Sequence, residues 1–567
     1  MTCATAEIGT LLRMAGPSTT VLRGGRVLCA DGTWAEAIAI RGGTVVALGS
    51  DADLAGLPAA TTVQLGGRPV LPGFVDAHAH PVWGGVEMAR CDLTGTATAA
   101  AAERVVGAYA AAHPELEWII GSGWAMPSFP GGRPSAGRLD AVAGDRPVFL
   151  VNRDHHSAWV SSAALRAAGI HAGTPDPADG RIERDPAGRP TGLLHEGAMA
   201  LVERLLPETT DAEFRAGLLV AQRYLHSLGI VAWQDAWVQI DGPESGLHRA
   251  YLAADRDGSL TARVVGAMWW DRTWPDDRIG AQVARLAAAR DDVLAADAPD
   301  GARRYRPDTV KVMQDGVAET FTAGLLEPYL DRCGRPTGNR GLSFLPPEVL
   351  RRVVGELAGA GFHLHFHALG DRAVREVLDA LAEHVPTGPA PSGGRHQLAH
   401  LQVVHPDDIP RFAALGVIAN LQPLWACHDS QMDDLTIPFL GAERARTQYP
   451  FEALRAAGAR LAMGSDWPVS SPDPLFGLHT AVNRVAPDAP AGTPPLYASA
   501  RLSLATALSA YTEGSRSALG LGPTLRVGAQ ADLVVLDRDP FAMPAELIHT
   551  ARVHRTYVAG RLVYRAD

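Results

Sequence analysis

Short apolar segments alternate with longer segments rich in Ala, Leu and Arg through the middle of the chain. Glycine or polar residues bound most of the apolar segments, and the stretches between them have the composition of helices. This alternation is typical of a parallel sheet whose strands are joined by helices. Ten segments show a strand pattern: 70–78, 118–123, 148–152, 230–235, 263–268, 309–313, 362–367, 396–401, 417–421 and 460–464.

A (β/α)8 barrel requires eight strands, so two of these segments are in excess. Segments 118–123 and 148–152 lie in a region rich in glycine and proline, where strand and helix do not alternate cleanly. We therefore predict an α/β fold with a TIM-type (β/α)8 barrel over residues 70–521. Residues 121–196 are predicted to form an inserted lid region over the barrel mouth.

The two ends of the chain have a different pattern, with short strand-like segments and paired glycines where hairpins would turn. Chain termini often lie close together in folded domains. We therefore predict that residues 1–69 and 522–567 form one composite β-sandwich beside the barrel.

Composition limits the partners and the location of the protein. Lys and Arg total 51 and Asp and Glu total 62, so the net charge is −11 at pH 7 with neutral His, which disfavours nucleic-acid binding. Five cysteines without a C-x-x-C pair argue against a disulfide framework, and no apolar stretch approaches the roughly 18 residues of a membrane span. We therefore expect a cytoplasmic protein with a small-molecule substrate and no membrane partner, and we leave a homodimer open.

Lys311 is the only lysine among the 51 basic residues, and the other 50 are arginine. So strong a bias indicates that most basic positions accept arginine, and that position 311 requires an amine. A buried lysine can lose its proton and react, whereas the guanidinium of arginine stays protonated. Survival of one lysine by drift is the alternative explanation.

Two histidines end the first predicted barrel strand. His78 and His80 stand two positions apart in PGFVDAHAH, so strand geometry directs both imidazoles to the same face. This H-x-H spacing is typical of a metal site, although paired histidines on a surface also occur by chance.

Other ligand-type residues follow the later strands, at the C-terminal ends where barrel enzymes place their active sites. They are Lys311 on the fourth strand, His367 at the end of the fifth, His400 at the end of the sixth and Asp466 after the eighth. We expect them to converge with the two histidines of the first strand. His363 and His365 lie deeper along the fifth strand, and we interpret them as core histidines or as supports behind the ligands.

Seven motifs follow one another along nearly the whole chain: PGFVDAHAH, RDHHSAWVSSAAL, PTGLLHEGA, VKVMQDG, HALGDRAV, GSDWPV and GAQADLVVLDRDP. Together they resemble the amidohydrolase superfamily and, within it, the YtcJ-like group of metal-dependent hydrolases that includes N-substituted formamide deformylase. Two positions depart from the group's pattern, because Ala399 stands where an acid is usual and Ser161 stands where Asn is common. These departures concern residues behind the ligands and not the ligands.

The resemblance implies two divalent metal ions. The implied ligand set is His78, His80 and Asp466 for one ion, His367 and His400 for the other, and a carboxylated Lys311 that bridges them. A lysine amine that has captured CO2 becomes a carbamate with two oxygen ligands, which arginine cannot provide. Imidazole and carboxylate ligands favour zinc, with Fe, Mn or Co as alternatives.

The same ligand set predicts hydrolytic chemistry. Metal-bound water would act as the nucleophile, and Asp466 would take its proton and deliver it to the leaving nitrogen. His156 matches a D-x-H-type motif of the family, and we expect it either to hydrogen-bond the substrate or to pin the lid. Four tryptophans after strand ends would wall an apolar or aromatic pocket, or else pack the lid: Trp83, Trp269, Trp425 and Trp467.

We therefore predict metal-dependent hydrolysis of a non-peptide C–N bond, in an N-substituted amide or formamide, with a cyclic amide or ester as the near alternative. A non-hydrolytic decarboxylase, lyase or isomerase of secondary metabolism is a second class, and a catalytically silent regulator on the same fold is a third. Retention of every ligand type disfavours the silent regulator.

Overall fold

Eight parallel strands form the central sheet of the computed structural model, which describes residues 18–177, 179–297, 303–384 and 394–567. In spatial order they are β8 (Phe74–Ala79), β15 (Ile230–Val238), β16 (Arg263–Trp269), β17 (Tyr305–Met313), β18 (His363–Ala368), β19 (Gln397–His400), β20 (Ile418–Leu421) and β21 (Arg460–Met463). The segment after β21 meets β8, because the Asp466 amide donates to the His78 carbonyl and the His80 amide to the Trp467 carbonyl, each at 2.7 Å. The predicted barrel is confirmed.

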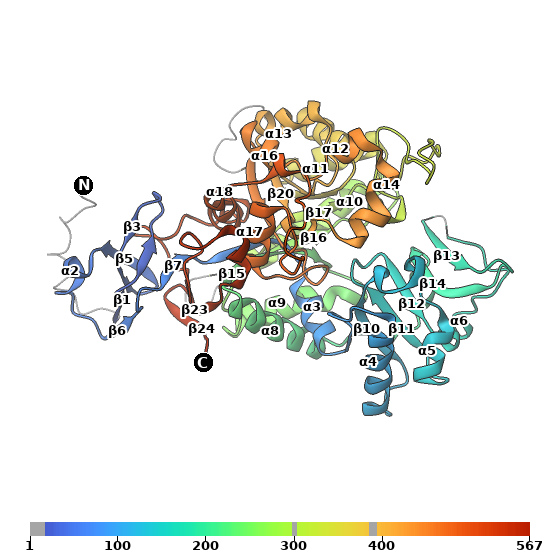
Figure 1. Ribbon diagram of the computed structural model, residues 1–567, viewed down its shortest axis with the longest axis horizontal. Helices are drawn as coiled ribbons and strands as arrows, with labels where there is room; N and C mark the ends of the chain where they lie inside the picture. Colours follow the sequence, from blue (N-terminus) through green and yellow to red (C-terminus); the bar gives the residue numbers. More distant parts are fainter. Residues whose placement is uncertain (1–17, 178, 298–302, 385–393) are drawn as a thin grey trace.

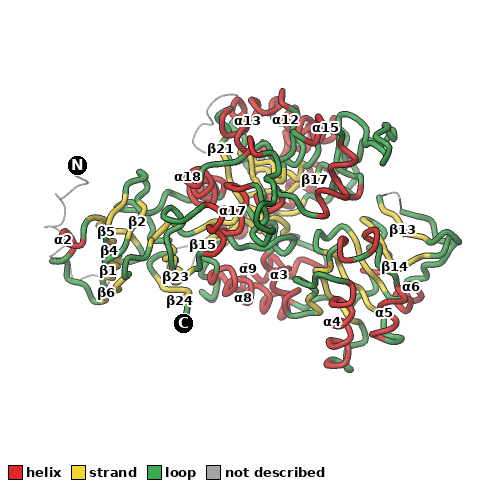
Figure 2. Tube along the Cα trace, viewed as in Figure 1, coloured by secondary structure: helices red, strands yellow, loops and turns green. Residues whose placement is uncertain are grey.

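Helices between the strands surround the barrel (Figures 1 and 2). They include α3 (Pro81–Met88), α8 (Asp211–Ser227), α9 (Gly246–Arg256), α10 (Ile279–Ala295), α11 (Pro347–Gly359), α12 (Asp371–His384), α13 (Ile409–Leu415), α14 (Ile437–Leu440), α15 (Ala442–Ala445), α16 (Phe451–Ala456), α17 (Pro474–Asn483), α18 (Leu504–Ser509) and α19 (Ser515–Ala518). In α8, a capping box of Thr210 and Glu213 starts the helix, and one face carrying Phe214, Leu218 and Leu225 is buried in the main core. Among the described helices, none has the length and apolarity needed to cross a membrane.

Side chains on the barrel strands alternate between the helical layer and the barrel interior. On β18, Leu364 and Phe366 belong to the apolar core shared with the helices. His365, one position away, instead contacts His78 of β8 across the barrel. The histidine side of β18 therefore faces the interior, where the predicted ligands lie.

The first predicted barrel strand divides into two strands. Its start forms β7 (Pro69–Pro72), which pairs with β2 and β22 in another sheet, and β8 begins only at Phe74. Gly73 lies at the junction, where a Cβ would stand 2.6 Å from a methyl group of Val231. A residue larger than glycine at this position would force the Val231 side chain of β15 to shift.

The ends of the described chain form two further sheets, the first from N-terminal strands alone and the second from both ends. One contains β5 (Thr44–Gly49), β4 (Ala37–Arg41), β1 (Thr19–Arg23) and β6 (Thr61–Gln64); the other contains β24 (Arg561–Arg565), β23 (Val553–Val558), β22 (Leu533–Leu536), β7, β2 (Arg26–Leu28) and β3 (Trp34–Ala35). Leu22 from the first sheet and Val27 and Val535 from the second lie in one apolar cluster. The short helix α2 (Asp51–Leu54) follows β5. The domain boundaries at residues 69 and 522 stay predictions, and residues 1–17 of the predicted sandwich lie outside the described part of the chain.

The two excess strand segments belong to a separate six-stranded sheet, which Figure 1 shows at the opposite end of the molecule from β1 and β6. Its strands, in spatial order, are β13 (Gly180–Arg184), β14 (Pro190–Glu196), β12 (Ser157–Val160), β11 (Val148–Asn152), β10 (Ile119–Trp124) and β9 (Cys91–Asp92). The helices of this unit are α4 (Ala99–Ala112), α5 (Ala136–Ala143), α6 (Ser162–Ala167) and α7 (Ala200–Glu203). The sheet thus begins at Cys91, before the expected start of the lid region at residue 121.

Candidate metal centre

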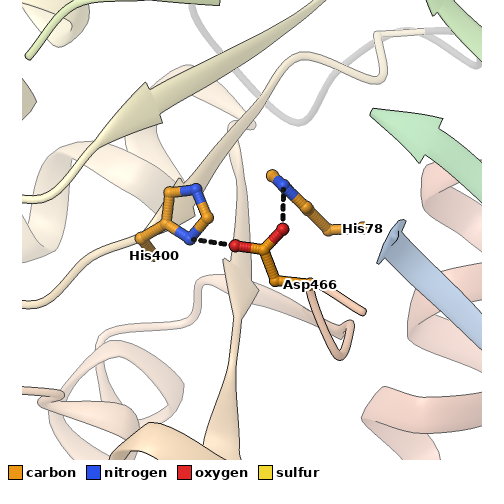
Figure 3. A group of neighbouring side chains, drawn as sticks. All are labelled: His78, His400 and Asp466. Atoms are coloured by element: carbon orange, nitrogen blue, oxygen red, sulfur yellow. Dashed lines mark ion pairs between the residues drawn. The ribbon is translucent and has the colours of Figure 1, made fainter. Parts of the chain in front are cut away.

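Two histidines and one aspartate meet where β21 closes onto β8. The Nε2 atoms of His78 and His80 lie 3.2 Å and 2.9 Å from Oδ1 of Asp466. Figure 3 shows His78 and His400 on opposite sides of the Asp466 carboxylate. His78 and Asp466 are 1% and 6% exposed, so the group lies inside the protein.

His400 completes a convergent set of ligand atoms. Its Nδ1 lies 3.9 Å from Oδ2 of Asp466, and one ligand atom from each of His78, His400 and Asp466 can be chosen so that all lie within 4.8 Å of one another. Nδ1 of His400 is buried and has no hydrogen-bond partner in the described part of the chain. A buried nitrogen is rarely left unpaired, so this atom and its neighbours fit a divalent cation well.

Lys311 reaches the same point from β17. Its Nζ lies 3.4 Å from Nε2 of His78, and the residue is 2% exposed. Burial lowers the pKa of this amine to about 7, against the opposing effect of the Asp466 carboxylate. The only lysine of the chain therefore contacts a predicted ligand and loses its proton readily.

His367 lies beside His400. The centroids of these two rings are 4.6 Å apart, and Nε2 of His367 lies 3.3 Å from the Gly316 carbonyl. Burial, together with the charge of Lys311, lowers the pKa of His367 well below its usual range. All six predicted ligand residues thus lie in one cluster, and His367 joins it through its ring contact with His400.

The backbone at the site adopts conformations that are uncommon for residues with side chains. His400 has φ 79° and Asp466 has φ 58°. A Cβ at Gly464 would lie 2.5 Å from the His78 amide nitrogen, so the chain can pass β8 only with glycine there. Such conformations persist where the surrounding structure imposes them, and they cluster at functional sites.

A chain of hydrogen-bonded, buried side chains holds the His78 ring in place. His365 Nε2 lies 2.7 Å from His78 Nδ1, and Gln234 contacts the other ring nitrogen of His365. Gln397 donates to Gln234 at 2.8 Å, and Asn420 donates to Gln397 at 2.8 Å. All four supporting side chains are completely buried, so their hydrogen bonds fix the orientation of the His78 ring.

The separate six-stranded sheet brings a histidine–carboxylate pair close to this cluster. His156 Nδ1 lies 3.0 Å from Oε1 of Glu196, and the His156 ring centroid is 6.4 Å from that of His367. Burial opposes protonation of His156, but the charge and hydrogen bonds of Glu196 raise its pKa to about 9. Sequence reasoning missed Glu196, although PTGLLHEGA was noted as a motif and Glu196 is its only carboxylate.

Two of the predicted substrate tryptophans, Trp425 and Trp269, lie next to residues of the candidate metal centre. Trp425 stacks on His400, with ring planes 4° apart and centroids separated by 5.2 Å. Trp269 adjoins Lys311 in the sheet register and stacks on Trp237 at 4.0 Å.

The other two tryptophans pack against helices. Trp83 on α3 meets the ring of Phe214 edge-on at 5.4 Å. Trp467 is 6% exposed, belongs to the main apolar core and lies 5.5 Å from the ring of Tyr224. Little of the Trp467 ring is left to contact a substrate.

A sequence model of the amidohydrolase family matches residues 61–564. The chain belongs to the amidohydrolase family. As an amidohydrolase, it is a metal-dependent hydrolase that acts on carbon–nitrogen bonds of small molecules. The predicted enzyme class is confirmed.

Three curated relatives match most of this amidohydrolase. It is 31% identical to Protein LONG AFTER FAR-RED 3 of Arabidopsis thaliana, over 94% of this chain and 88% of that protein. It is 29% identical to the putative amidohydrolase YtcJ of Bacillus subtilis, over 94% and 97% of the two chains. It is 26% identical to the N-substituted formamide deformylase of Arthrobacter pascens, over 95% and 96%. The predicted resemblance to the YtcJ-like group is confirmed.

A solved structure shows the same fold. The crystal structure of an uncharacterized metal-dependent hydrolase from Pyrococcus horikoshii superposes with a TM-score of 0.70, over 93% of this chain and 99% of that one, at 24% identity.

Proposed function

We propose that this amidohydrolase cleaves the C–N bond of an N-substituted amide or formamide at a centre of two divalent metal ions. The observation that carries the proposal is the convergence of four histidines, one aspartate and the only lysine at the C-terminal end of the barrel. The similarity to a protein named N-substituted formamide deformylase supports this substrate class.

The cluster divides into two groups of proposed ligands. They are His78, His80 and Asp466 for one ion and His367 and His400 for the other, with a carboxylated Lys311 between them. The neutral Lys311 amine would form an N–C bond with CO2 and release a proton, which leaves an anion with two oxygen atoms. Imidazole and carboxylate ligands make zinc the proposed metal. When bound, the ions supply an activated water and polarise the substrate carbonyl.

Asp466 is the proposed proton carrier. Burial raises the pKa of its carboxyl, but contacts with His78 and His80 outweigh that effect and hold the pKa well below its usual range. Its Oδ1 contacts both histidines, whereas Oδ2 has only the longer contact with His400. Oδ2 is therefore the oxygen that can accept a proton from the attacking water and deliver it to the leaving nitrogen.

His156 and Trp425 are the proposed substrate contacts. Glu196 occupies Nδ1 of His156, so Nε2 is the nitrogen left to hydrogen-bond a substrate carbonyl or leaving group. Trp425 would present a flat apolar wall beside His400. Replacing Trp425 with alanine should then raise KM for aryl amides more than for small amides.

The test combines metal analysis of the purified protein with a screen of N-formyl, N-acyl and cyclic amides. We expect two metal equivalents and release of an amine from an N-formyl substrate. Lys311→Arg should lose metal and activity, and a short carboxylate such as propionate should partly restore Lys311→Gly. Unchanged metal content and activity in Lys311→Arg would overturn the bridging role.

The screen also separates the other function classes. Conversion of a substrate without hydrolytic release of an amine would point to lyase or isomerase chemistry. A metal-loaded protein that converts nothing while it binds a ligand would point to the silent regulator. A cytoplasmic location, the absence of nucleic-acid partners and a homodimer remain predictions.

A further inference from the structure

A large cavity lies at the end of the barrel opposite the metal centre. Its volume is about 700 Å³. It is lined by residues at or before the starts of β16 and β17, by the segment between α19 and β22, and by the Gly42–Thr44 turn between β4 and β5. The cavity therefore lies between the barrel and the sheets formed by the two chain ends.

Arginine dominates the lining of this cavity. The six arginines are Arg263, Arg303, Arg304, Arg306, Arg516 and Arg526. So dense a positive cluster is unexpected in a chain whose net charge is −11. Like charges gathered around one hollow repel each other, and an anion between them would offset that repulsion.

The carboxylates that pair with these arginines are too few to neutralise them. Asp532 is completely buried and binds both Arg263 and Arg516. Asp308 is likewise shared, since it lies 3.7 Å from Arg306 and 2.8 Å from Arg395, which adjoins the lining residue Gly520. Each carboxylate carries one negative charge and is shared by two arginines, so each pair of arginines keeps a net positive charge.

Several guanidinium nitrogens still lack a partner. Nη1 of Arg395 is buried without a hydrogen bond to the described residues. The side chains of Arg304 and Arg526 make no hydrogen bond or ion pair within the described ranges. Burial lowers the pKa of Arg306; the charge of Asp308 opposes this shift, and the charge of Arg395 adds to it. Guanidinium groups bind phosphate and carboxylate in a bidentate manner, so the unpaired donors point to an oxyanion.

We propose that this cavity binds a small polyanion, a molecule that carries two or more phosphate or carboxylate groups. The volume lies in the range of ligand pockets, and the arginines come both from the barrel strands and from the segment that follows the barrel, so a ligand with more than one anionic group can engage both sets. A ligand held there would connect the barrel to the end-formed sheets. It would act as a stabilising or effector ligand and not as a substrate, because the metal ligands lie at the other end of the strands.

Calorimetric titration of the metal-loaded enzyme tests the proposal, with a sugar bisphosphate and with propane-1,2,3-tricarboxylate as probes. Sodium chloride at equal ionic strength controls for screening, and metal analysis after titration controls for chelation. We expect saturable binding of at least one probe and a rise in the melting temperature that saturates with it. Binding of only one probe assigns the anionic group as phosphate or carboxylate.

Paired variants locate the binding. Arg304→Gln combined with Arg526→Gln should raise Kd at least tenfold, because both side chains lack other partners and their removal breaks no internal contact. Arg104→Gln combined with Arg166→Gln removes the same charge from the lid unit and should leave Kd unchanged. Absence of saturable binding, or equal Kd values in the two double variants, would overturn the proposal.

Discussion

His365 offers the sharpest test of how the protein holds its proposed metal ligands. Replacing it with leucine keeps a side chain of similar size but removes the partner of His78 Nδ1, now 2.7 Å away, and the partner of the Gln234 amide. Both groups lie where no water reaches them. An unpaired buried polar group costs about 1–3 kcal/mol, and loss of such a support behind a ligand lowers metal affinity by about 10–100-fold.

The assay is competition for metal between the protein and a chelator, followed by thermal unfolding of the metal-free form. We expect His365→Leu to weaken metal binding, and His365→Gln to recover part of it because its amide can still hydrogen-bond His78. His363→Leu is the matched control, since His363 lies at the outer start of the same strand and contacts the ring of His396 instead. Metal affinity in His365→Leu equal to that of the wild type would refute the reasoning, even if the protein melted earlier.

Three further substitutions probe other parts of the molecule. Glu196→Ala should lower kcat by about 10²-fold or more while metal content stays constant, because His156 loses the group that orients it; a parallel loss of metal would contradict this. Asp532→Asn should destabilise the protein by about 3–5 kcal/mol at pH 7, measured by urea unfolding, because two arginines lose their shared carboxylate. Those arginines lower the pKa of Asp532 in the folded protein despite its burial. The contribution of Asp532 to the free energy of unfolding is therefore present above about pH 4 and is lost as the pH falls further. This pH dependence should be absent from the variant. Gly464→Ala should impair both metal content and melting temperature, because its Cβ would collide with the His78 amide; full metal occupancy would count against that steric argument.

The barrel could be predicted because each of its strands is a separate apolar segment followed by a helix. The separate six-stranded sheet was harder to predict, since its first part repeats the strand–helix alternation of the barrel. The elements β9, α4, β10, α5 and β11 differ from those of the barrel only in the sheet that their strands join. The sequence pattern also did not show that segment 70–78 divides into two strands. Its apolar pattern is continuous, and only the pairing partners, β2 and β22 for β7 and β15 for β8, show where one sheet ends and the next begins.

The convergence of the proposed ligand residues could be predicted because strand ends of a barrel converge whatever the side chains are. Their supports could not, because Gln234, Gln397 and Asn420 carry no spacing signal and are linked only by hydrogen bonds across the barrel. Glu196 could have been found from its motif, but its partner His156 lies forty residues earlier, and the pairing depends on the lid sheet.

The continuity of β7 and β8 couples the candidate metal site to a second sheet. His78 stands six residues after Pro72, and the strand that ends at Pro72 is hydrogen-bonded to β22, far later in the sequence. β22 therefore holds the segment that leads directly into the strand of His78. Displacing β22 is expected to loosen the start of β8 and, through it, the position of the His78 and His80 side chains.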